Sequence, residues 1–276
     1  MRNTNKHAPP TLLIDGDIIA YKAASAVNKT FTFDGDNYIQ TASLEEAKII
    51  VDDSLASLLS GFKTTHYVIA MTDAVNWRHN VYPLYKANRK DKPKPLVLSE
   101  VKEYMREAFI TYQRPTLEAD DILGILATSG TQILKDNPQG EKIIVSADKD
   151  MKGIPGLFYD LGPQTVTEIS EQEANRFHMY QTLIGDVADG YPGCPGIGPV
   201  KAERILSEGG SYEEWWPLVV KAYEKVGKLT EDDALVQARI SRICRVTDYD
   251  YIKKEVKLWE KTMPPSNTMT TNPATT

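Results

Sequence analysis

Three short segments, each an apolar run with an acidic residue within three positions of its end, constrain the fold of this chain more than any other feature. They are TLLIDGD (11–17), HYVIAMTD (66–73) and KIIVSADKD (142–150). Apolar runs of this length are typical of strands that are buried on both faces. The segments 44–60 and 118–134 between them carry apolar residues at helical spacing. Strands that alternate with helices predict right-handed crossovers and a doubly wound, mainly parallel α/β sheet.

The rest of the chain predicts a second, helical domain. After residue 185 the pattern is helical throughout, with candidate helices at 199–208, 211–226 and 230–245. The segment TFTFDGDNYIQT (30–41) predicts a β-hairpin around Asp-Gly. We therefore expect the following organisation: a flexible N-terminus at 1–10, a catalytic domain at 11–185, a helical domain at 186–260 and a disordered polar tail at 261–276.

The composition limits the classes of protein to which this chain can belong. With 276 residues, of which 41% are hydrophobic, the chain can bury a substantial core. A net charge of −6 and a pI of about 5.4 argue against nucleic-acid binding, unless the acids are metal ligands. Residues 1–10 lack a signal-peptide core, so we expect a cytoplasmic protein. Two cysteines, Cys194 and Cys244, predict reduced thiols rather than a disulfide framework.

Nine acidic residues are candidate metal ligands: Asp15, Asp73, Glu118, Asp120, Asp121, Asp148, Asp150, Asp186 and Asp189. Most lie at the end of a predicted strand or beside the first turn of the helix that follows one. Ligands of open parallel sheets bind beyond the carboxyl ends of the strands, so we expect these acids to converge there. The alternative for any single acid is a helix cap or a turn.

The spacing of the acids supports this convergence. Asp148 and Asp150 are two residues apart on a segment expected to be extended, which predicts that both point to one side. Glu118 and Asp121 lie three residues apart at a helix start, and Asp186 and Asp189 have the same spacing near a predicted helix end.

A cluster of this kind requires cations. Two carboxylates about 4 Å apart repel by roughly 4 kcal/mol at an effective dielectric constant near 20. All-oxygen ligation suits Mg²⁺ or Mn²⁺ rather than zinc. Two such ions would stabilise the attacking and leaving oxygens of a phosphoryl displacement.

The segment NWRHNVYPLYKANRKDKPKP (76–95) predicts a mobile loop or a loosely helical lid over the same site. Lys86, Arg89 and Lys90 could neutralise phosphates there. Trp77, Tyr82 and Tyr85 could stack on unpaired bases. The alternatives are a solvated charged loop and aromatic side chains that belong to the core.

A glycine-containing turn precedes the predicted helix 199–208. Gly196, Ile197 and Gly198 come directly before Pro199, which suits the first turn of a helix. Backbone N–H groups at a helix start attract phosphate, and Lys201 and Arg204 follow within reach. The turn therefore predicts contacts with a duplex backbone that do not read its sequence.

Taken together, these motifs resemble the 5′-nuclease superfamily. The superfamily includes flap endonucleases, the 5′-nuclease domain of bacterial DNA polymerases and bacteriophage replicative 5′ to 3′ exonucleases. The resemblance covers about residues 11–260 and is carried by LIDGD, TDAVNWR with YKANRK, LEADD, SADKDM and GDVADGYPGCPGIGPVKA. It implies a PIN-like sheet domain, with a basic arch in the span 76–110 and a C-terminal helix-two-turns-helix element.

The resemblance also implies roles for individual residues. Asp15, Asp73, Glu118 and Asp120 match the ligands of a first metal, with Asp121 in the same cluster, and Asp148, Asp150, Asp186 and Asp189 match a second. Lys86 and Arg89 match catalytic residues of the arch, with Tyr85 beside them. The turn at Gly196–Ala202 matches the duplex-binding element, whose carbonyls could hold K⁺. The arch span is short, which leaves open whether 5′ ends thread through it or enter an open groove.

We therefore predict a monomeric, two-metal 5′ to 3′ exonuclease that acts on double-stranded DNA and releases 5′-phosphorylated products. If the chain is of phage origin, it would act in the host cytoplasm, in DNA replication, primer removal or DNA degradation. Two alternatives are a 5′ flap endonuclease or ribonuclease H acting on RNA–DNA hybrids, and a non-catalytic protein that binds DNA structures.

Overall fold

The computed structural model describes residues 8–32, 38–90, 92–130 and 140–261. Within these residues, a central sheet has the strand order β5-β4-β1-β6-β7-β8, and every neighbouring pair is parallel except β7 and β8. The strands are β1 (Thr11–Asp15), β4 (Tyr67–Ala70), β5 (Thr111–Tyr112), β6 (Lys142–Ser146), β7 (Gly156–Asp160) and β8 (Thr165–Ile169). The predicted mainly parallel α/β class is thereby confirmed.

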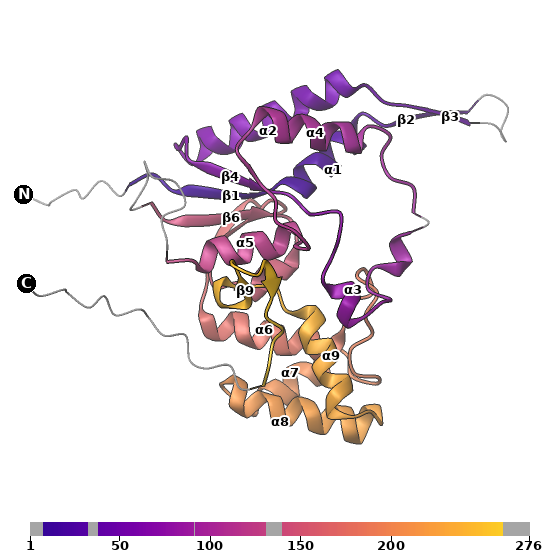
Figure 1. The fold of residues 1–276 in the computed structure, drawn as a ribbon, viewed down its shortest axis with the longest axis vertical. Helices are drawn as coiled ribbons and strands as arrows, with labels where there is room; N and C mark the ends of the chain where they lie inside the picture. The colour runs from indigo at the N-terminus through magenta and orange to yellow at the C-terminus, as the bar shows by residue number, and fades with distance from the viewer. Residues whose placement is uncertain (1–7, 33–37, 91, 131–139, 262–276) are drawn as a thin grey trace, which may run out of the picture.

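Helices cover both faces of this sheet (Figure 1). One face is covered by α1 (Gly16–Ala26), α2 (Leu44–Gly61) and α4 (Leu98–Ala108), and the other by α5 (Ala119–Thr128) and α6 (Glu171–Ile184). The expected helix at 118–134 is shorter than predicted, since α5 ends at Thr128, and residues 131–134 of the predicted range lie outside the described residues.

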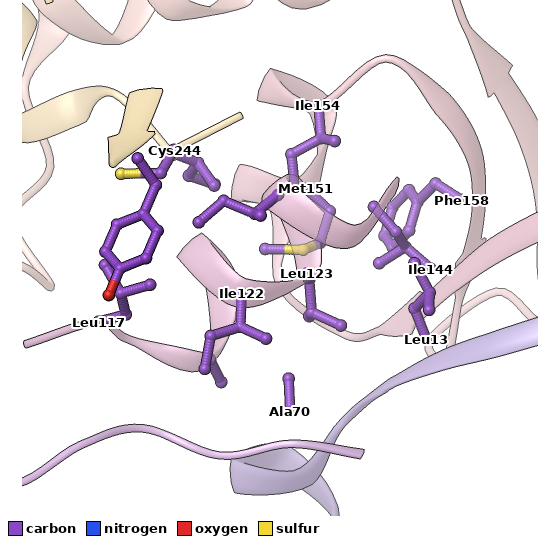
Figure 2. Packing of buried hydrophobic residues seen from close by; sticks show 14 of the residues in the cluster. Leu13, Ala70, Leu117, Ile122, Leu123, Ile144, Met151, Ile154, Phe158 and Cys244 are labelled. Carbon is purple, nitrogen blue, oxygen red and sulfur yellow. The ribbon is translucent and has the colours of Figure 1, made fainter. Parts of the chain in front are cut away.

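Strand alternation explains the two layers of the core. Leu12 and Ile14 of β1 pack with α1, α2 and α4, whereas Leu13 between them faces the opposite side. Figure 2 shows this second layer, where Ile122 and Leu123 of α5 lie with Leu13, Met151 and Phe158. The apolar strands are therefore buried on both faces, as their composition predicts.

Smaller elements surround the sheet. A hairpin of β2 (Lys29–Thr32) and β3 (Tyr38–Thr41) projects from the body, and its connecting residues 33–37 lie outside the described residues. The segment after β4 contains α3 (Arg78–Val81) and the 3₁₀ turn η1 (Ala87–Arg89). The segment 76–95 thus has short helical turns separated by irregular chain.

The chain after residue 185 is mainly helical. It contains α7 (Pro199–Leu206), α8 (Tyr212–Ala222), a π-helical turn at Tyr223–Gly227, α9 (Glu231–Ser241), the 3₁₀ turn η4 (Val246–Asp248) and a short ribbon of β9 (Tyr249–Asp250) and β10 (Glu255–Val256). Both cysteines are buried and free. No helix in the described part of the chain is long and apolar enough to cross a membrane.

Candidate active site

The carboxyl ends of β1 and β6 bring the first acids together. Asp15 ends β1, caps α1 by accepting from the Ile18 amide at 3.1 Å, and accepts from the Ser146 hydroxyl of β6 at 2.8 Å. Burial raises the pKa of Asp15 to about 6, and the charges of Asp17 and Asp148 add to that rise against the opposing Ser146 hydrogen bond. This is a carboxylate held where its negative charge is poorly solvated.

Asp120 of α5 belongs to the same neighbourhood. Burial raises its pKa well above the usual range, and the charges of Asp15, Asp148 and Glu118 add to the rise. A half-buried carboxylate beside three other acids would be stabilised by a cation of higher charge than Lys86, the basic group that lowers its pKa.

A second group of acids surrounds Asp150. Burial, followed by the charges of Asp148, Asp186 and Asp189, raises the pKa of Asp150 to about 7. Because Asp148 also acts on Asp15 and Asp120, it lies between the two groups. The expectation that Asp148 and Asp150 share an extended segment is wrong. Asp148 caps the 3₁₀ turn η2 (Lys149–Gly153) and accepts from the Asp150 amide at 2.9 Å.

Asp186 and Asp189 lie in the loop directly after α6, so they are near a helix end as predicted, but they do not share a helix face. α6 ends at Ile184, and Gly185 turns the chain with a φ of 68°. A Cβ on Gly193, whose φ is 64°, would lie 2.3 Å from the Gly185 nitrogen. These two glycines let the loop close on itself, and Asp186 then pairs with Lys149 at 2.8 Å.

Asp121 is a structural residue rather than a metal ligand, which corrects the prediction. Its two oxygens accept from Arg78 at 2.8 Å each, from Trp77 Nε1 at 3.0 Å and from the backbone of Glu118 and Cys244. The side chain is completely buried. Burial alone would raise the pKa of Asp121, but Arg78 lowers it below the usual value. These five donors occupy both carboxylate oxygens of Asp121.

Arg78 ties Glu118 into the same interior. Its guanidinium donates to Glu118 at 3.0 Å and to the carbonyls of Ile240 and Arg242 at 2.8 and 2.7 Å. The pKa of Glu118 is lowered because Lys86 and Arg78 outweigh the effect of its burial. Arg78 therefore connects α3 and α5 to α9 and the chain that follows it.

Asp73 lies after β4, and each of its oxygens has a partner. Gln113 Nε2 donates to one at 3.0 Å, and the amide of Thr116 donates to the other at 2.9 Å. Burial alone would raise the pKa of Asp73, but the hydrogen bonds it accepts, first those from Thr116 and Gln113, together lower it below its usual value. The structure thus holds Asp73 against the β5–α5 connection, and its role as a metal ligand stays a prediction.

The segment 76–95, called the basic segment below, lies directly against the acids. Lys86 forms ion pairs with Glu118 and Asp189, and Arg89 pairs with Asp189. The Lys86 backbone, in the left-handed region with a φ of 54°, donates to the Asp189 carbonyl at 2.7 Å. Asn88 reaches the carbonyl of Val187 at 2.7 Å. The cations therefore balance part of the negative charge of the acid site.

The predicted stacking role of Tyr85 and Trp77 is wrong, because both rings are buried. Tyr85 is 3% exposed, and its hydroxyl lies 3.0 Å from Glu118 Oε2 and 2.9 Å from Asp189 Oδ2. Trp77 is 6% exposed and donates to Asp121. Tyr82 is partly exposed and Lys90 is exposed.

The glycine turn begins α7 as the sequence indicates. Gly196 has a φ of 79°, Gly198 is the N-cap residue, and the Ile197 side chain is buried in the helical core. Lys201 and Arg204 are exposed, and Lys201 Nζ donates to the Gly196 carbonyl at 2.7 Å. A side-chain cation thus contacts one of the turn carbonyls.

The acids of the described residues do not form a preformed metal cage: no three of them, alone or with histidine or cysteine, are arranged to hold an ion. The reason is that several acids turn toward nearby cations and amides, such as Lys86, Arg89 and Gln113. The donor chemistry still fits Mg²⁺ or Mn²⁺, because Asp15, Asp120 and Asp150 are carboxylates with raised pKa values.

Sequence reasoning missed three residues that organise the site: Arg78, Ser146 and Gln181. Gln181 donates to Asp150 at 2.7 Å and Ser146 to Asp15 at 2.8 Å. Ser146 was detectable in principle, because it ends the strand before Asp148. The sequence contains no signal that α6 would bring Gln181 to Asp150, since that contact depends on packing.

Comparisons with known proteins agree with this architecture. Residues 10–156 match the family model described as "5′-3′ exonuclease, N-terminal resolvase-like domain". The chain is 31% identical over 287 residues to an exodeoxyribonuclease of Enterobacteria phage T3, covering 90% of this chain and 92% of the relative. It is 30% identical over 286 residues to an exonuclease of Escherichia phage T7, with the same coverage.

A solved structure shares the fold. A bacteriophage T5 flap endonuclease in complex with DNA and metal ions superposes with a TM-score of 0.62 at 14% identity, covering 84% of this chain and 88% of that one. The family match spans more than half of the chain, and the two phage relatives align over nearly all of it. The chain belongs to the 5′–3′ exonuclease family and is a nuclease of that class.

Proposed function

We propose that the protein is a divalent-metal-dependent exonuclease that degrades double-stranded DNA from its 5′ ends. The observation that carries the proposal is the group of Asp15, Asp120, Asp148 and Asp150 beneath the segment that bears Lys86. Burial, together with the charges of neighbouring acids, raises the pKa values of Asp15, Asp120 and Asp150. The T3 relative is named an exodeoxyribonuclease, which supports DNA as the substrate.

Two cations, when bound, would activate water and stabilise the leaving oxygen of an in-line phosphodiester hydrolysis. Asp15, Asp120, Asp148 and Glu118 would hold the first and Asp150, Asp186 and Asp189, with Asp148 between the groups, the second. Asp73 would support the first from the edge of the site. Mg²⁺ and Mn²⁺ both suit such ligands.

The basic residues would neutralise the negative charge of the substrate phosphates. Lys86 and Arg89, which pair with Glu118 and Asp189 in the free protein, would exchange these carboxylates for phosphate oxygens of the scissile nucleotide. Their cationic groups already lie at the acids of the site.

The turn before α7 would bind the duplex beyond the reacting phosphate. Its exposed Gly196, Gly198, Lys201 and Arg204 are suited to contacts with the sugar-phosphate backbone. K⁺ at the turn carbonyls would compete with Lys201 for Gly196. These contacts fix position without reading sequence.

Degradation of a duplex labelled at either the 5′ or the 3′ end, in Mg²⁺ or EDTA, tests the proposal. We expect early, Mg²⁺-dependent release of the 5′ label as 5′-phosphorylated mononucleotides or short oligonucleotides. Early release of the 3′ label, or cleavage in EDTA, would contradict it. Several relatives are named flap endonucleases, so a 5′-flap substrate and an RNA–DNA hybrid belong in the same assay. Faster cleavage of the flap would favour the endonuclease alternative.

A further inference from the structure

Gln181 is a buried amide that reaches from α6 into the acid site. The residue is 3% exposed, and its Nε2 donates to Oδ1 of Asp150 at 2.7 Å. Asp150 itself belongs to η2, which packs along α6. A buried amide that loses its partner is destabilising, so this contact fixes both side chains relative to each other.

The contact occupies only one of the two carboxylate oxygens. Oδ1 accepts from Gln181, whereas Oδ2 accepts no hydrogen bond from any residue that the structure describes. The amide thus restricts rotation of the carboxylate and leaves the second oxygen available. Groups that form a hydrogen bond with a metal-binding side chain, without contacting the metal themselves, orient that side chain in this way.

An uncharged donor is the residue type that this position requires. A lysine or arginine would form an ion pair with Asp150, as Arg78 does with Asp121, and would occupy the oxygens that a cation needs. An apolar side chain would leave the carboxylate free to rotate among Asp148, Asp186 and Asp189, the acids that surround it. Glutamine orients Asp150 without neutralising it.

We propose that Gln181 is a positioning residue of the metal site and holds the Asp150 carboxylate in the orientation that binds a divalent cation. The inference rests on the proposed function, because it assigns a partner to one of the ligands proposed there. Loss of such a partner typically lowers metal affinity or activity by about 10- to 100-fold.

Mn²⁺ binding to the full chain, measured by isothermal titration calorimetry, tests this role without relying on activity. Gln181→Met removes the donor and keeps the length of the side chain. We expect it to bind Mn²⁺ about 10- to 100-fold more weakly than the wild type. We also expect raised Mn²⁺ to restore its duplex cleavage, whereas Asp150→Ala should stay inactive at every Mn²⁺ concentration.

The matched control is Thr182→Val, which removes a buried hydroxyl from the next position of α6. That hydroxyl donates to the His178 carbonyl at 2.9 Å and contacts no acid. Wild-type Mn²⁺ affinity in Gln181→Met, or equal losses in both variants, would overturn the positioning role. If Gln181→Met does not fold, Gln181→Asn keeps an amide that is too short to reach Asp150, and the same affinity loss is expected. A wild type that neither binds Mn²⁺ nor cleaves DNA would instead contradict the proposed function itself.

Discussion

The guanidinium of Arg78 and the carboxylate of Asp121 form a buried two-pronged ion pair, with both N–O distances at 2.8 Å. Arg78 is 2% exposed and Asp121 is completely buried. The pair connects the start of the basic segment to the helix that carries Asp120. It shows that one acid of the LEADD motif serves the fold, while its neighbour faces the other acids of the site.

Arg78→Met should therefore destabilise the protein strongly. Removing one partner leaves Asp121 buried without a counter-charge, which typically costs about 3–5 kcal/mol. Urea denaturation of the two proteins measures the difference. Arg176→Ala, which breaks a solvent-accessible pair with Glu203, should change stability by less than about 1 kcal/mol. Similar effects of the two substitutions would contradict the structural role of Arg78.

Divalent cations should stabilise the protein more at pH 8 than at pH 5. The pKa values of Asp15 and Asp150, about 6 and about 7, lie above their unfolded value of 3.8. Their protonated forms therefore stabilise the fold below pH 4, and this contribution is lost as pH rises through 6 and 7. Cations replace those protons at high pH. Melting temperatures with Mg²⁺ or EDTA at both pH values measure the effect, and a larger Mg²⁺ shift at pH 5 would contradict it.

His178 should make the protein less stable in acid. Its Nε2 donates to the Ala238 carbonyl at 2.7 Å, and its Nδ1 accepts from Tyr212, which fixes a neutral ring. Burial, followed by the charge of Arg242, lowers the pKa of His178 well below 6.5. Stability from this residue is thus full above pH 6.5 and falls as pH drops toward the folded pKa.

The variant His178→Gln isolates this effect, because its side chain forms hydrogen bonds but does not titrate. The difference in unfolding free energy between the wild type and the variant should shrink from pH 7 to pH 5. A difference that is constant over this range would show that the pKa of His178 is the same in the folded and unfolded states.

Gly193→Ala should disrupt the loop that carries Asp186 and Asp189. Its φ of 64° is unfavourable for alanine, and the added Cβ would lie 2.3 Å from the Gly185 nitrogen. We expect a stability loss of at least about 1 kcal/mol and lower nuclease activity. Gly61→Ala is the control, because nothing lies within 4 Å of its added Cβ. Thermal unfolding that ranks the two variants equally would contradict this account of the loop.

Local patterns were sufficient to predict the mainly parallel class of the sheet, its strands β1, β4 and β6, and the helices α2 and α5. An apolar run such as TLLID predicts a strand that is buried on both faces, and helices cover both faces of β1 in the structure. The periodicity of 118–134 indicated a helix, but it did not show that the helix ends at Thr128. The spacing of Asp186 and Asp189 also did not show that they lie in a loop after α6, since that turn depends on the close approach of Gly185 and Gly193.

The site was predictable at the level of residue types but not of partners. A strand end followed by aspartate correctly indicated where Asp15 and Asp148 lie. The roles of Asp121, Tyr85 and Trp77 depended on Arg78, which enters the interior from a segment expected to be a mobile loop or a loosely helical lid. Sequence spacing does not show which carboxylate a buried arginine will pair with, because that choice is made by three-dimensional packing.

The most direct test of the central claim compares Asp150→Ala with Asp160→Ala in single-turnover cleavage of a 5′-labelled duplex in Mg²⁺. Both aspartates follow or end strands at the same edge of the sheet, but Asp160 accepts only local turn hydrogen bonds. Asp150→Ala should be at least about a thousandfold slower while still folded, a loss of about 4 kcal/mol of transition-state stabilisation. Asp160→Ala should cleave at the wild-type rate. Near-normal cleavage by folded Asp150→Ala would contradict a metal-dependent mechanism built on these acids.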